Sequence, residues 1–428
     1  MNIVMVTNTY LPHIGGVARS IESFTREYRL RGHRVLVVAP EFPGQPENEC
    51  DVVRIPAIQN FNGSDFSVVL PAPGVLSDAL ERFEPDIIHS HHPYLLGMTA
   101  LRKARKRDLP LVFTHHTLYE RYTHYVPGDS PTLARFVIEL ATRYANLTDH
   151  VFAPSESVAT LIRKRGVKVP VTVVPTGVEM ERFEHGDGRG MRRRLGIVDD
   201  DFVVGHVGRL AAEKNLDFLA KAVRDFLLVH PRSRFLIVGR GPAAEEIAMV
   251  FAASGLSDRI HMTGALDGTA LRDAYHAMDV FAFSSKSETQ GMVLTEAMAA
   301  GVPVVALDAS GVGELVQDGE QGRLLRDEDI VGFTAALRWI HDLPPSARGR
   351  MNDAVRQRAR EWSMSRTADR ALAVYEGLLG TLRTGPIEEL DEWHGMLERI
   401  KAEWDIVKGV AGAAGAAIAT DSRPGNGR

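Results

Sequence analysis

The chain has 428 residues, a single cysteine and no long apolar run. One cysteine, Cys50, excludes an intramolecular disulfide and any site built from several thiolates, such as a zinc finger or an iron–sulfur cluster. No stretch reaches the roughly 20 apolar residues of a membrane-spanning helix, and the N-terminus turns polar too soon for a signal peptide. We therefore expect a cytoplasmic protein that would meet a membrane only at its surface.

The chain also lacks a large excess of charge of either sign. Fifty Lys and Arg face 55 Asp and Glu, a formal charge of -5, so we expect no nucleic-acid partner. Apolar residues make up 44% and charged residues 25%, which is typical of globular chains and excludes collagen-like and wholly disordered classes. The length predicts two or three domains.

Short β-branched runs alternate with helical stretches along most of the chain. Continuous apolar runs bounded by Gly, Pro or charge are typical of strands buried on both faces. Their alternation with helices predicts parallel sheets, so we expect an α/β fold of two doubly wound Rossmann-like domains. The expected strands are 3–6, 35–39, 86–89, 111–114, 151–153 and 171–174, then 203–207, 235–238, 260–262, 280–283 and 303–306.

We expect the seam between the domains at Val174-Pro175-Thr176-Gly177-Val178, because proline fixes φ and glycine permits a sharp change of direction. An apolar stripe from Ile387 to Trp404 predicts a last helix that packs on its own protein. The predicted parts are 1–175 and 176–365 for the two domains, 366–408 for C-terminal helices, and 409–428 for a disordered tail.

A glycine pair, Gly15 and Gly16, separates the first strand from its helix. Without side chains, the backbone N–H groups there can approach a phosphate or a sugar closely, and the helix N-terminus adds attraction. The alternative is that the glycine pair only forms a tight turn and binds no ligand. The three-glycine dinucleotide fingerprint is not matched, which counts against a hydride-transfer enzyme.

The first strand of the second domain is followed by Gly208-Arg209-Leu210 and then by Lys214. Two cations five residues apart, just past the carboxyl end of a strand, lie where doubly wound sheets bind ligands. They could neutralise a departing diphosphate. The alternative is a pair of solvated surface cations.

The most specific motif runs from Ser284 to Ala306. It predicts a strand end, a polar loop and a helix that begins near Gly291. Glu288 precedes that helix and Glu296 lies about a turn and a half inside it, so one carboxylate can accept from sugar hydroxyls and the other from a ribose diol. The predicted anion site consists of the N–H groups of Gly291, Met292, Val293 and Leu294.

Together these motifs resemble the retaining glycosyltransferases of family 4, which have the two-Rossmann GT-B fold. The resemblance extends over nearly the whole chain to about Leu382. It implies that 1–175 binds the acceptor, that 176–365 binds the nucleotide sugar, and that the first C-terminal helix packs back on the N-terminal domain. The motifs, in order, are Gly15-Gly16, Asp86 to His91, Val174 to Val178, Gly208-Arg209-Leu210 with Glu213-Lys214, Val238 to Pro242, and Glu288 to Glu296.

The resemblance also implies roles for single residues. Arg209 and Lys214 would hold the diphosphate of the donor, Glu288 the hydroxyls of the transferred sugar, and Glu296 the ribose. His116 would reach the donor sugar near the reacting centre. The catalytic set is thus His116, Glu288, Arg209 and Lys214, and the donor site is completed by Gly15, Gly16, Gly208 and the N–H groups from Gly291 to Leu294.

Histidines gather in the first domain, which raises the question of a metal. No carboxylate or thiolate completes a ligand set in sequence, so lining of a cleft is the favoured alternative. The acidic runs 199–201 and 327–329 are expected to be solvated loops. We expect no metal and no cofactor besides the nucleotide sugar. The histidines are His89, His91, His92, His115, His116 and His124.

The acceptor is suggested by two weaker signals. The stretch from Phe113 to Tyr125 looks like its counterpart in diacylglycerol 3-glucosyltransferases, which implies a lipid acceptor near Tyr119 and Tyr122; plain aromatic packing is the alternative. A basic run could dock on an anionic membrane, or could be a solvated helix face. It consists of Arg102, Lys103, Arg105, Lys106 and Arg107.

The sequence thus predicts transfer of a hexose from a UDP-sugar such as UDP-glucose to an acceptor hydroxyl, with retained configuration. The acceptor would be a membrane lipid such as diacylglycerol, reached from the cytoplasmic face of the plasma membrane. Rival hypotheses are a soluble sugar or polysaccharide acceptor and a UDP-sugar epimerase of the same fold. A scaffold without activity would be expected to have lost Arg209, Lys214 or one of the glutamates.

Overall fold

The computed structural model describes residues 1–380 apart from 14, 59–67, 70–72, 122–130 and 287. Its contacts define one compact unit of Met1–Leu118 and Leu140–Leu379, which holds both large sheets, and a second of Tyr119–Glu139 and Gly380–Arg428. Described in the second unit are η2 (Tyr119–Arg121) and the beginning of α4 (Pro131–Asn146). The helix predicted from Pro386, the tail 409–428, His124 and Tyr122 lie outside the described residues.

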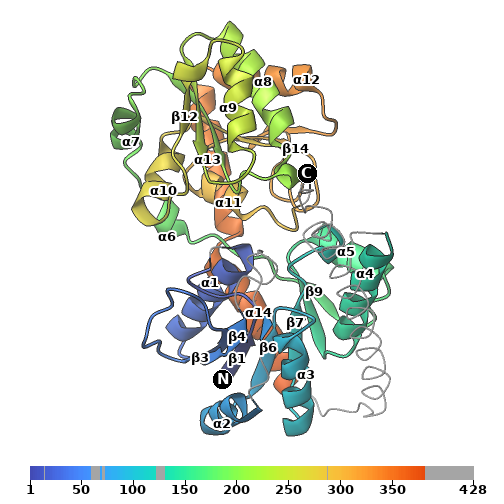
Figure 1. The fold of residues 1–428 in the computed structure, drawn as a ribbon. Helices are drawn as coiled ribbons and strands as arrows, with labels where there is room; N and C mark the ends of the chain where they lie inside the picture. The colour runs from blue at the N-terminus through green and yellow to red at the C-terminus, as the bar shows by residue number, and fades with distance from the viewer. Residues whose placement is uncertain (14, 59–67, 70–72, 122–130, 287, 381–428) are drawn as a thin grey trace, which may run out of the picture. The chain divides into compact units, whose positions relative to one another are not determined.

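The first sheet is parallel throughout, in the order β3-β2-β1-β6-β7-β8-β9 (Figure 1). The order reverses between β1 and β6, and ligands of doubly wound sheets bind at the carboxyl ends of strands where this happens. Its strands are β1 (Asn2–Val6), β2 (Arg34–Pro40), β3 (Val52–Ile55), β6 (Ile87–Ser90), β7 (Leu111–Thr114), β8 (His150–Ala153) and β9 (Val171–Val173). Between them lie α1 (Gly16–Leu30), the pair β4 (Ala57–Ile58) and β5 (Val68–Val69), α2 (Pro73–Phe83), α3 (Leu96–Arg107), α4 and α5 (Glu156–Lys164).

The second sheet is also parallel, in the order β12-β11-β10-β13-β14-β15, with its reversal between β10 and β13. Its strands are β10 (Phe202–Val207), β11 (Ser233–Val238), β12 (Ile260–Met262), β13 (Val280–Phe283), β14 (Val304–Leu307) and β15 (Gly322–Leu325). The helical elements are α6 (Met180–Phe183), α7 (Gly188–Leu195), η4 (Ala212–Lys214), α8 (Leu216–Val229), α9 (Ala244–Ala252), η5 (Ser257–Arg259), α10 (Gly268–His276), α11 (Met292–Ala299), α12 (Ile330–His341), α13 (Pro345–Glu361) and α14 (Met364–Leu379).

Side chains of the second sheet pack on both of its faces, as its uninterrupted apolar runs require. In β10, Val203 and Val207 join one buried cluster with residues of α10, α11 and α13, whereas Phe202 and Val204 join another with α8 and α12. Alternation along a strand sends neighbouring residues to opposite faces. The predicted α/β fold of two doubly wound sheets is therefore confirmed.

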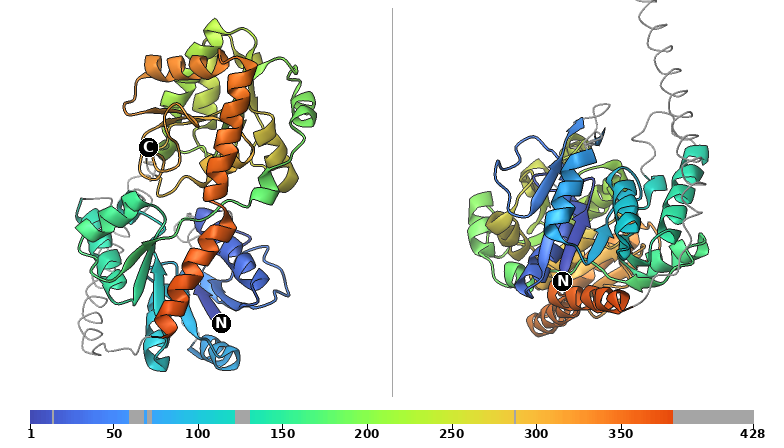
Figure 2. Two further views of the ribbon diagram at one scale, coloured as in Figure 1. Left: turned by 180° about the vertical axis from the view of Figure 1, so that it is seen from behind. Right: turned by 90° about the horizontal axis from the view of Figure 1, so that it is seen from below.

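α14 belongs to the core of the first sheet although it follows the second sheet in the chain. Ala368, Ala371 and Tyr375 are buried in one cluster with Ile21 of α1 and Ile87 of β6. Figure 2 shows α13 and α14 as consecutive orange helices. The expected return of the first C-terminal helix to the N-terminal domain is confirmed.

The sequence did not predict β3 or β15, which form edges of the two sheets. Each carries an arginine, Arg54 and Arg323, and neither strand is buried along its whole length. An edge strand needs burial on fewer sides than a central one, so its apolar signal is short and interrupted. The domain boundaries at 175 and 365 stay predictions.

The chain leaves the region of the first sheet and returns to it through paired segments. Val178 N donates to Trp362 O and Met364 N to Val178 O, both at 2.9 Å, in a parallel bridge of Val178 with Ser363. A Cβ on Gly177 would lie 2.3 Å from Met364 Cα. Glycine is therefore required here by the close approach of two backbones.

Within the part of the chain that the structure describes, no helix is both long enough and apolar enough to span a membrane.

We predict that Gly177→Ala lowers the free energy of unfolding by about 3 kcal/mol, because the new methyl group overlaps backbone that cannot move alone. The matched control is Gly349→Ala in α13, where a Cβ meets nothing within 4 Å. This control should be stabilised by up to about 1 kcal/mol, since alanine favours the helix. Thermal midpoints of both variants check this, and equal midpoints would contradict it.

Candidate active site

The sequence motifs lie in the loops at the two points where strand order reverses. The glycine pair follows β1, and the histidine run begins at the end of β6. In the second sheet, Arg209 follows β10 and Glu288 follows β13. Because all strands are parallel, the loops after neighbouring strands share one edge of each sheet, which brings together residues far apart in sequence.

Lys214 and Glu288 form the centre of the second edge. Lys214 Nζ lies 2.6 Å from Glu288 Oε1, and the side chains are only 19% and 16% exposed. Arg209 forms an ion pair with Glu213, and its own side chain is half exposed. The structure therefore joins Lys214 to Glu288, as the resemblance implied for one site, and leaves Arg209 at its rim.

Hydrogen bonds between the loops hold this arrangement. Ser284 Oγ donates to the carbonyl oxygens of Lys214 (2.9 Å) and Asn215 (3.0 Å). Asn215 has φ +55°, a left-handed conformation that asparagine tolerates, and it ends η4 just before α8. A Cβ on Gly239 would lie 1.8 Å from Gly208 O, so the loop after β11 packs directly on the loop after β10.

α11 begins at the end of the Glu288 loop. Gly291 caps it at φ +75°, a conformation suited to glycine, and Met292, Val293 and Leu294 form its first turn. The preceding residue, Gln290, accepts from Thr176 N at 2.6 Å and donates to Thr176 O. Of the four predicted N–H groups, that of Leu294 donates to Gly291 O at 2.9 Å, so the predicted anion site is reduced to those of Gly291, Met292 and Val293, at the helix N-terminus that follows Glu288.

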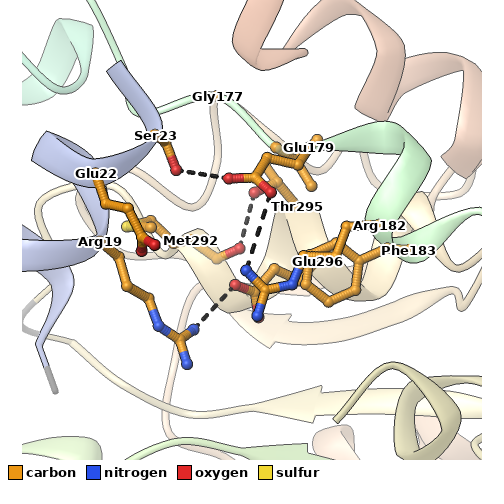
Figure 3. Close-up of a pocket in the computed structure, with 11 residues that line it drawn as sticks. Arg19, Glu22, Ser23, Gly177, Glu179, Arg182, Phe183, Met292, Thr295 and Glu296 are labelled. Carbon is orange, nitrogen blue, oxygen red and sulfur yellow. Dashed lines mark hydrogen bonds and ion pairs between the residues drawn. The ribbon is translucent and has the colours of Figure 1, made fainter. Parts of the chain in front are cut away.

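Glu296 lies one turn further along α11, where it lines a small pocket that opens to solvent (Figure 3). Tyr275 Oη donates to its Oε2 at 2.7 Å, and Arg19 Nη1 lies 3.3 Å from its Oε1. Burial raises the pKa of Glu296, while Arg19 and the Tyr275 hydrogen bond oppose that rise. The pocket is lined by Arg19, Glu22, Ser23, Gly177, Val178, Glu179, Arg182, Phe183, Met292, Thr295 and Glu296.

A second carboxylate of this pocket, Glu179, was not predicted. It accepts from Ser23 Oγ at 2.8 Å and pairs with Arg26 at 2.7 Å and with Arg182 at 3.9 Å. Arg19 was missed as well, although it lies three residues after Gly16 on the first turn of α1, and that spacing was the available signal. Tyr275 carries no such local signal.

The glycine pair occupies the N-terminus of α1, with Gly15 as its cap and Gly16 as its first residue. A Cβ on Gly16 would meet nothing within 4 Å, whereas a Cβ on Gly15 would lie 3.2 Å from His13 Nε2. Nearby, Asn8 Nδ2 donates to Tyr94 O at 3.1 Å, and Asn8 N donates to His92 Nδ1 at 3.1 Å. The loops after β1 and β6 therefore support each other.

His91 and His116 lie together at the edge of the first sheet as neutral groups. His91 Nδ1 and His116 Nε2 are 2.9 Å apart, with their rings stacked. Desolvation is the main cause that holds the pKa of each well below its usual value, and neighbouring histidines add to it. Within the described part of the chain, no hydrogen-bond partner reaches His91 Nε2. His116 thus presents a neutral imidazole.

His89 belongs to a buried network that reaches α14. Its Nε2 lies 2.7 Å from Thr114 Oγ1, and Tyr375 Oη lies 2.5 Å from its Nδ1. Desolvation lowers the pKa of His89 to about 3 and that of His92 to about 3. His206, behind the Lys214 loop, has its pKa lowered to about 4 by burial.

Among the described residues, no three His, Cys, Asp or Glu side chains are grouped so that they could hold a metal ion.

The acidic run 199–201 was expected to be a solvated loop. This expectation is wrong for Asp201, which is 5% exposed and pairs with Arg234 at 3.1 Å. Asp201 directly precedes β10 and Arg234 lies on β11, so this ion pair joins two neighbouring strands at the start of β10.

The basic run lies on α3, where part of it is held by the protein. Lys103 donates to Ser77 Oγ, Arg107 Nη2 to Ser77 O (3.4 Å), and Arg105 Nη2 to Leu147 O (2.9 Å). Arg102 and Lys106, four residues apart, are exposed. Tyr119 is in η2, within the second unit.

Comparison with known proteins agrees with the fold. A likeness to the Anabaena protein HepE bound to UDP has a TM-score of 0.70 at 20% identity and covers 88% of this chain and 100% of that one. The model of Glycosyltransferase Family 4 matches residues 14–182, and that of Glycosyl transferases group 1 matches 189–362. These are domains of glycosyltransferases with the GT-B fold, so the class of enzyme is defined.

Curated relatives agree. A GDP-mannose-dependent alpha-mannosyltransferase of Mycolicibacterium smegmatis is 32% identical over 89% of this chain and 98% of its own length. An alpha-monoglucosyldiacylglycerol synthase of Streptococcus pneumoniae is 29% identical over 78% of this chain and 77% of its own. The chain belongs to glycosyltransferase family 4.

Neutral buried histidines make stability fall in acid. An unfolded histidine binds a proton below about pH 6.5, whereas His89, His92 and His206 stay neutral in the folded chain until about pH 3, 3 and 4. Each should therefore remove about 1.4 kcal/mol of stability per pH unit below 6.5. Urea unfolding at pH 7.5, 6.0 and 5.0 measures the slope.

A paired substitution isolates one histidine. His92→Asn keeps an acceptor for Asn8 N but cannot be protonated, so its slope should be shallower than that of the native chain. His185→Asn, at an exposed position, should keep the native slope. Identical slopes for all three proteins would show that buried His92 does not contribute.

Proposed function

We propose that this glycosyltransferase moves a hexose from a UDP-sugar, such as UDP-glucose, to the hydroxyl of a membrane lipid such as diacylglycerol, with retention of the anomeric configuration. The observation that carries the proposal is the Lys214–Glu288 pair at the switch point of the second sheet, beside the first turn of α11.

On binding, groups of the donor would replace the contacts that Lys214, Arg209 and Glu288 make within the protein. The diphosphate takes Lys214 and Arg209, and the N–H groups of the first turn of α11. Glu288, released from Lys214, accepts from hydroxyls of the transferred sugar. Both side chains are mostly buried, so water competes little, and fixed charges act strongly on the developing negative charge.

Departure of the diphosphate is the difficult step, and preorganised positive charge lowers its barrier. In a front-face substitution, the acceptor hydroxyl attacks from the side of the leaving group, and the leaving phosphate takes the acceptor proton. His116 is held neutral, so it would meet a sugar hydroxyl as a hydrogen-bond partner without charge. The neutral cluster suits a sugar, and the charged loops suit a diphosphate.

The lipid acceptor is supported by the relative that is named as an alpha-monoglucosyldiacylglycerol synthase. Arg102 and Lys106 are exposed on one side of α3, and each basic residue near an anionic leaflet contributes about 1 kcal/mol. Another relative is named as a GDP-mannose-dependent alpha-mannosyltransferase. GDP-mannose is therefore the main alternative to UDP-glucose as the donor.

Transfer is tested with purified full-length chain, mixed vesicles of dioleoylglycerol and phosphatidylglycerol, and labelled UDP-glucose, UDP-galactose or GDP-mannose. We expect label from UDP-glucose in the organic phase and an α-configured product by proton NMR. A β-configured product would overturn retention. Label that stays in water with an added sugar acceptor would overturn the lipid, and turnover with GDP-mannose alone would overturn UDP.

The site assignment is tested by Lys214→Ala and Glu288→Gln, which should each lower kcat/KM by about a hundredfold or more. The control is another ion pair of the same length, Lys221–Asp217 at 2.6 Å on α8. Lys221→Ala and Asp217→Asn should leave turnover unchanged. Near-native activity in either site variant would refute the assignment.

Membrane docking is tested by reversing charge on α3. The double variant Arg102→Glu, Lys106→Glu should bind vesicles with 30% phosphatidylglycerol about tenfold or more weakly, since four charge units change. Arg193→Glu with Arg350→Glu, at exposed positions on α7 and α13, alters net charge equally and should bind as the native chain does. Equal losses in both double variants would place docking outside α3. Sedimentation with vesicles measures the binding.

A further inference from the structure

Glu296 has two side-chain partners, one fully buried and one partly exposed to solvent. Its residue is 6% exposed, and its carboxylate accepts from Tyr275 Oη at 2.7 Å and pairs with Arg19 at 3.3 Å. A buried carboxylate needs donors to replace the water it has lost. Which of these donors a ligand can replace is decided by how each is held.

Tyr275 is fixed. It is fully buried on α10, and its ring packs against Phe183, with centroids 5.7 Å apart, and against Phe281, at 6.0 Å. Burial, with Glu296 as a further cause, raises the pKa of Tyr275 well above its usual value, so the phenol keeps its proton and donates. Its hydroxyl can therefore set the orientation of the carboxylate in every state of the site.

Arg19 is replaceable. Its side chain is 30% exposed, and it reaches Glu296 from the first turn of α1 (Figure 3). A partly exposed ion pair contributes little to stability because water screens the charges and the long side chain loses freedom. A guanidinium presents several N–H donors side by side, and a vicinal diol can offer two O–H donors to the same oxygen.

We propose that Tyr275 is the positioning residue of the ribose site, and that Arg19 is the group which the ribose hydroxyls displace from Glu296. This rests on the proposed role of Glu296 in the donor site. Oε2 keeps its hydrogen bond with Tyr275 throughout. Oε1, which faces the pocket, exchanges the N–H of Arg19 for the hydroxyls of the ribose.

The experiment compares UDP with 2′,3′-dideoxy-UDP on the full-length chain by calorimetry. These ligands share base and diphosphate and differ only in the ribose hydroxyls, so the ratio of their dissociation constants reports the hydroxyl contacts alone. Tyr275→Phe keeps the packed ring and removes the donor. Arg19→Met keeps a long side chain and removes the charge.

Tyr275→Phe should lower the preference for UDP over the dideoxy ligand about tenfold or more, with binding of the dideoxy ligand unchanged. Arg19→Met should raise that preference about two- to fivefold, because the competitor of the hydroxyls is gone. Tyr144→Phe is the control: it removes another buried hydroxyl, 2.9 Å from Gly97 O, and should leave the preference as it is.

Equal weakening of both ligands by Tyr275→Phe would mean a merely structural role and would overturn its part of the proposal. A preference lowered by Arg19→Met would mean that Arg19 stays with the ribose. If the native chain discriminates, and Glu296→Gln removes the discrimination while Tyr275→Phe does not, the ribose site stands and this inference alone fails. If the native chain binds both ligands alike, Glu296 is no ribose ligand. In that case the proposed role of Glu296 in the donor site fails together with this inference.

Discussion

A carboxylate that leaves water must find donors, and this constraint accounts for the contacts that join distant segments around the charged side chains. Glu288 finds Lys214, and Glu179 finds Ser23. Glu314 accepts from the backbone N–H groups of Glu156 and Ser157 at the start of α5, at 2.8 Å each. In each case the donor comes from a distant part of the sequence, so these contacts also hold separate segments of the chain together.

The polar side chains at the carboxyl edges of the two sheets differ in charge. The edge of the second sheet carries opposite charges in pairs, whereas the edge of the first carries histidines that burial keeps neutral. A diphosphate needs charge, and a sugar needs neutral donors and acceptors. The two edges thus differ in polarity, and this difference is what the proposed division between diphosphate and sugar relies on.

Sequence was sufficient where the signal is local. The central strands follow from uninterrupted apolar runs, and the helix of Glu296 follows from Gly291 and the polar loop before it. Tyr275 could not be inferred, because its importance arises only when α10 brings it to Glu296. For Arg19 the sequence offered only its spacing from Gly16, and its partner Glu296 lies 277 residues away. Edge strand β3 was missed for a related reason, since Arg54 interrupts its apolar run.

The parallel bridge between Val178 and Ser363, where the chain returns to the first sheet, has a consequence for biosynthesis. α14 follows the second sheet in the chain, yet its Tyr375 and Ala371 close the core of the first. During synthesis, β1 and its neighbours leave the ribosome early, but the apolar face that α14 covers stays open until the chain has grown past residue 379. The first sheet is made first and completed last, so a nascent chain of this enzyme depends for longest on protection from aggregation at its oldest end.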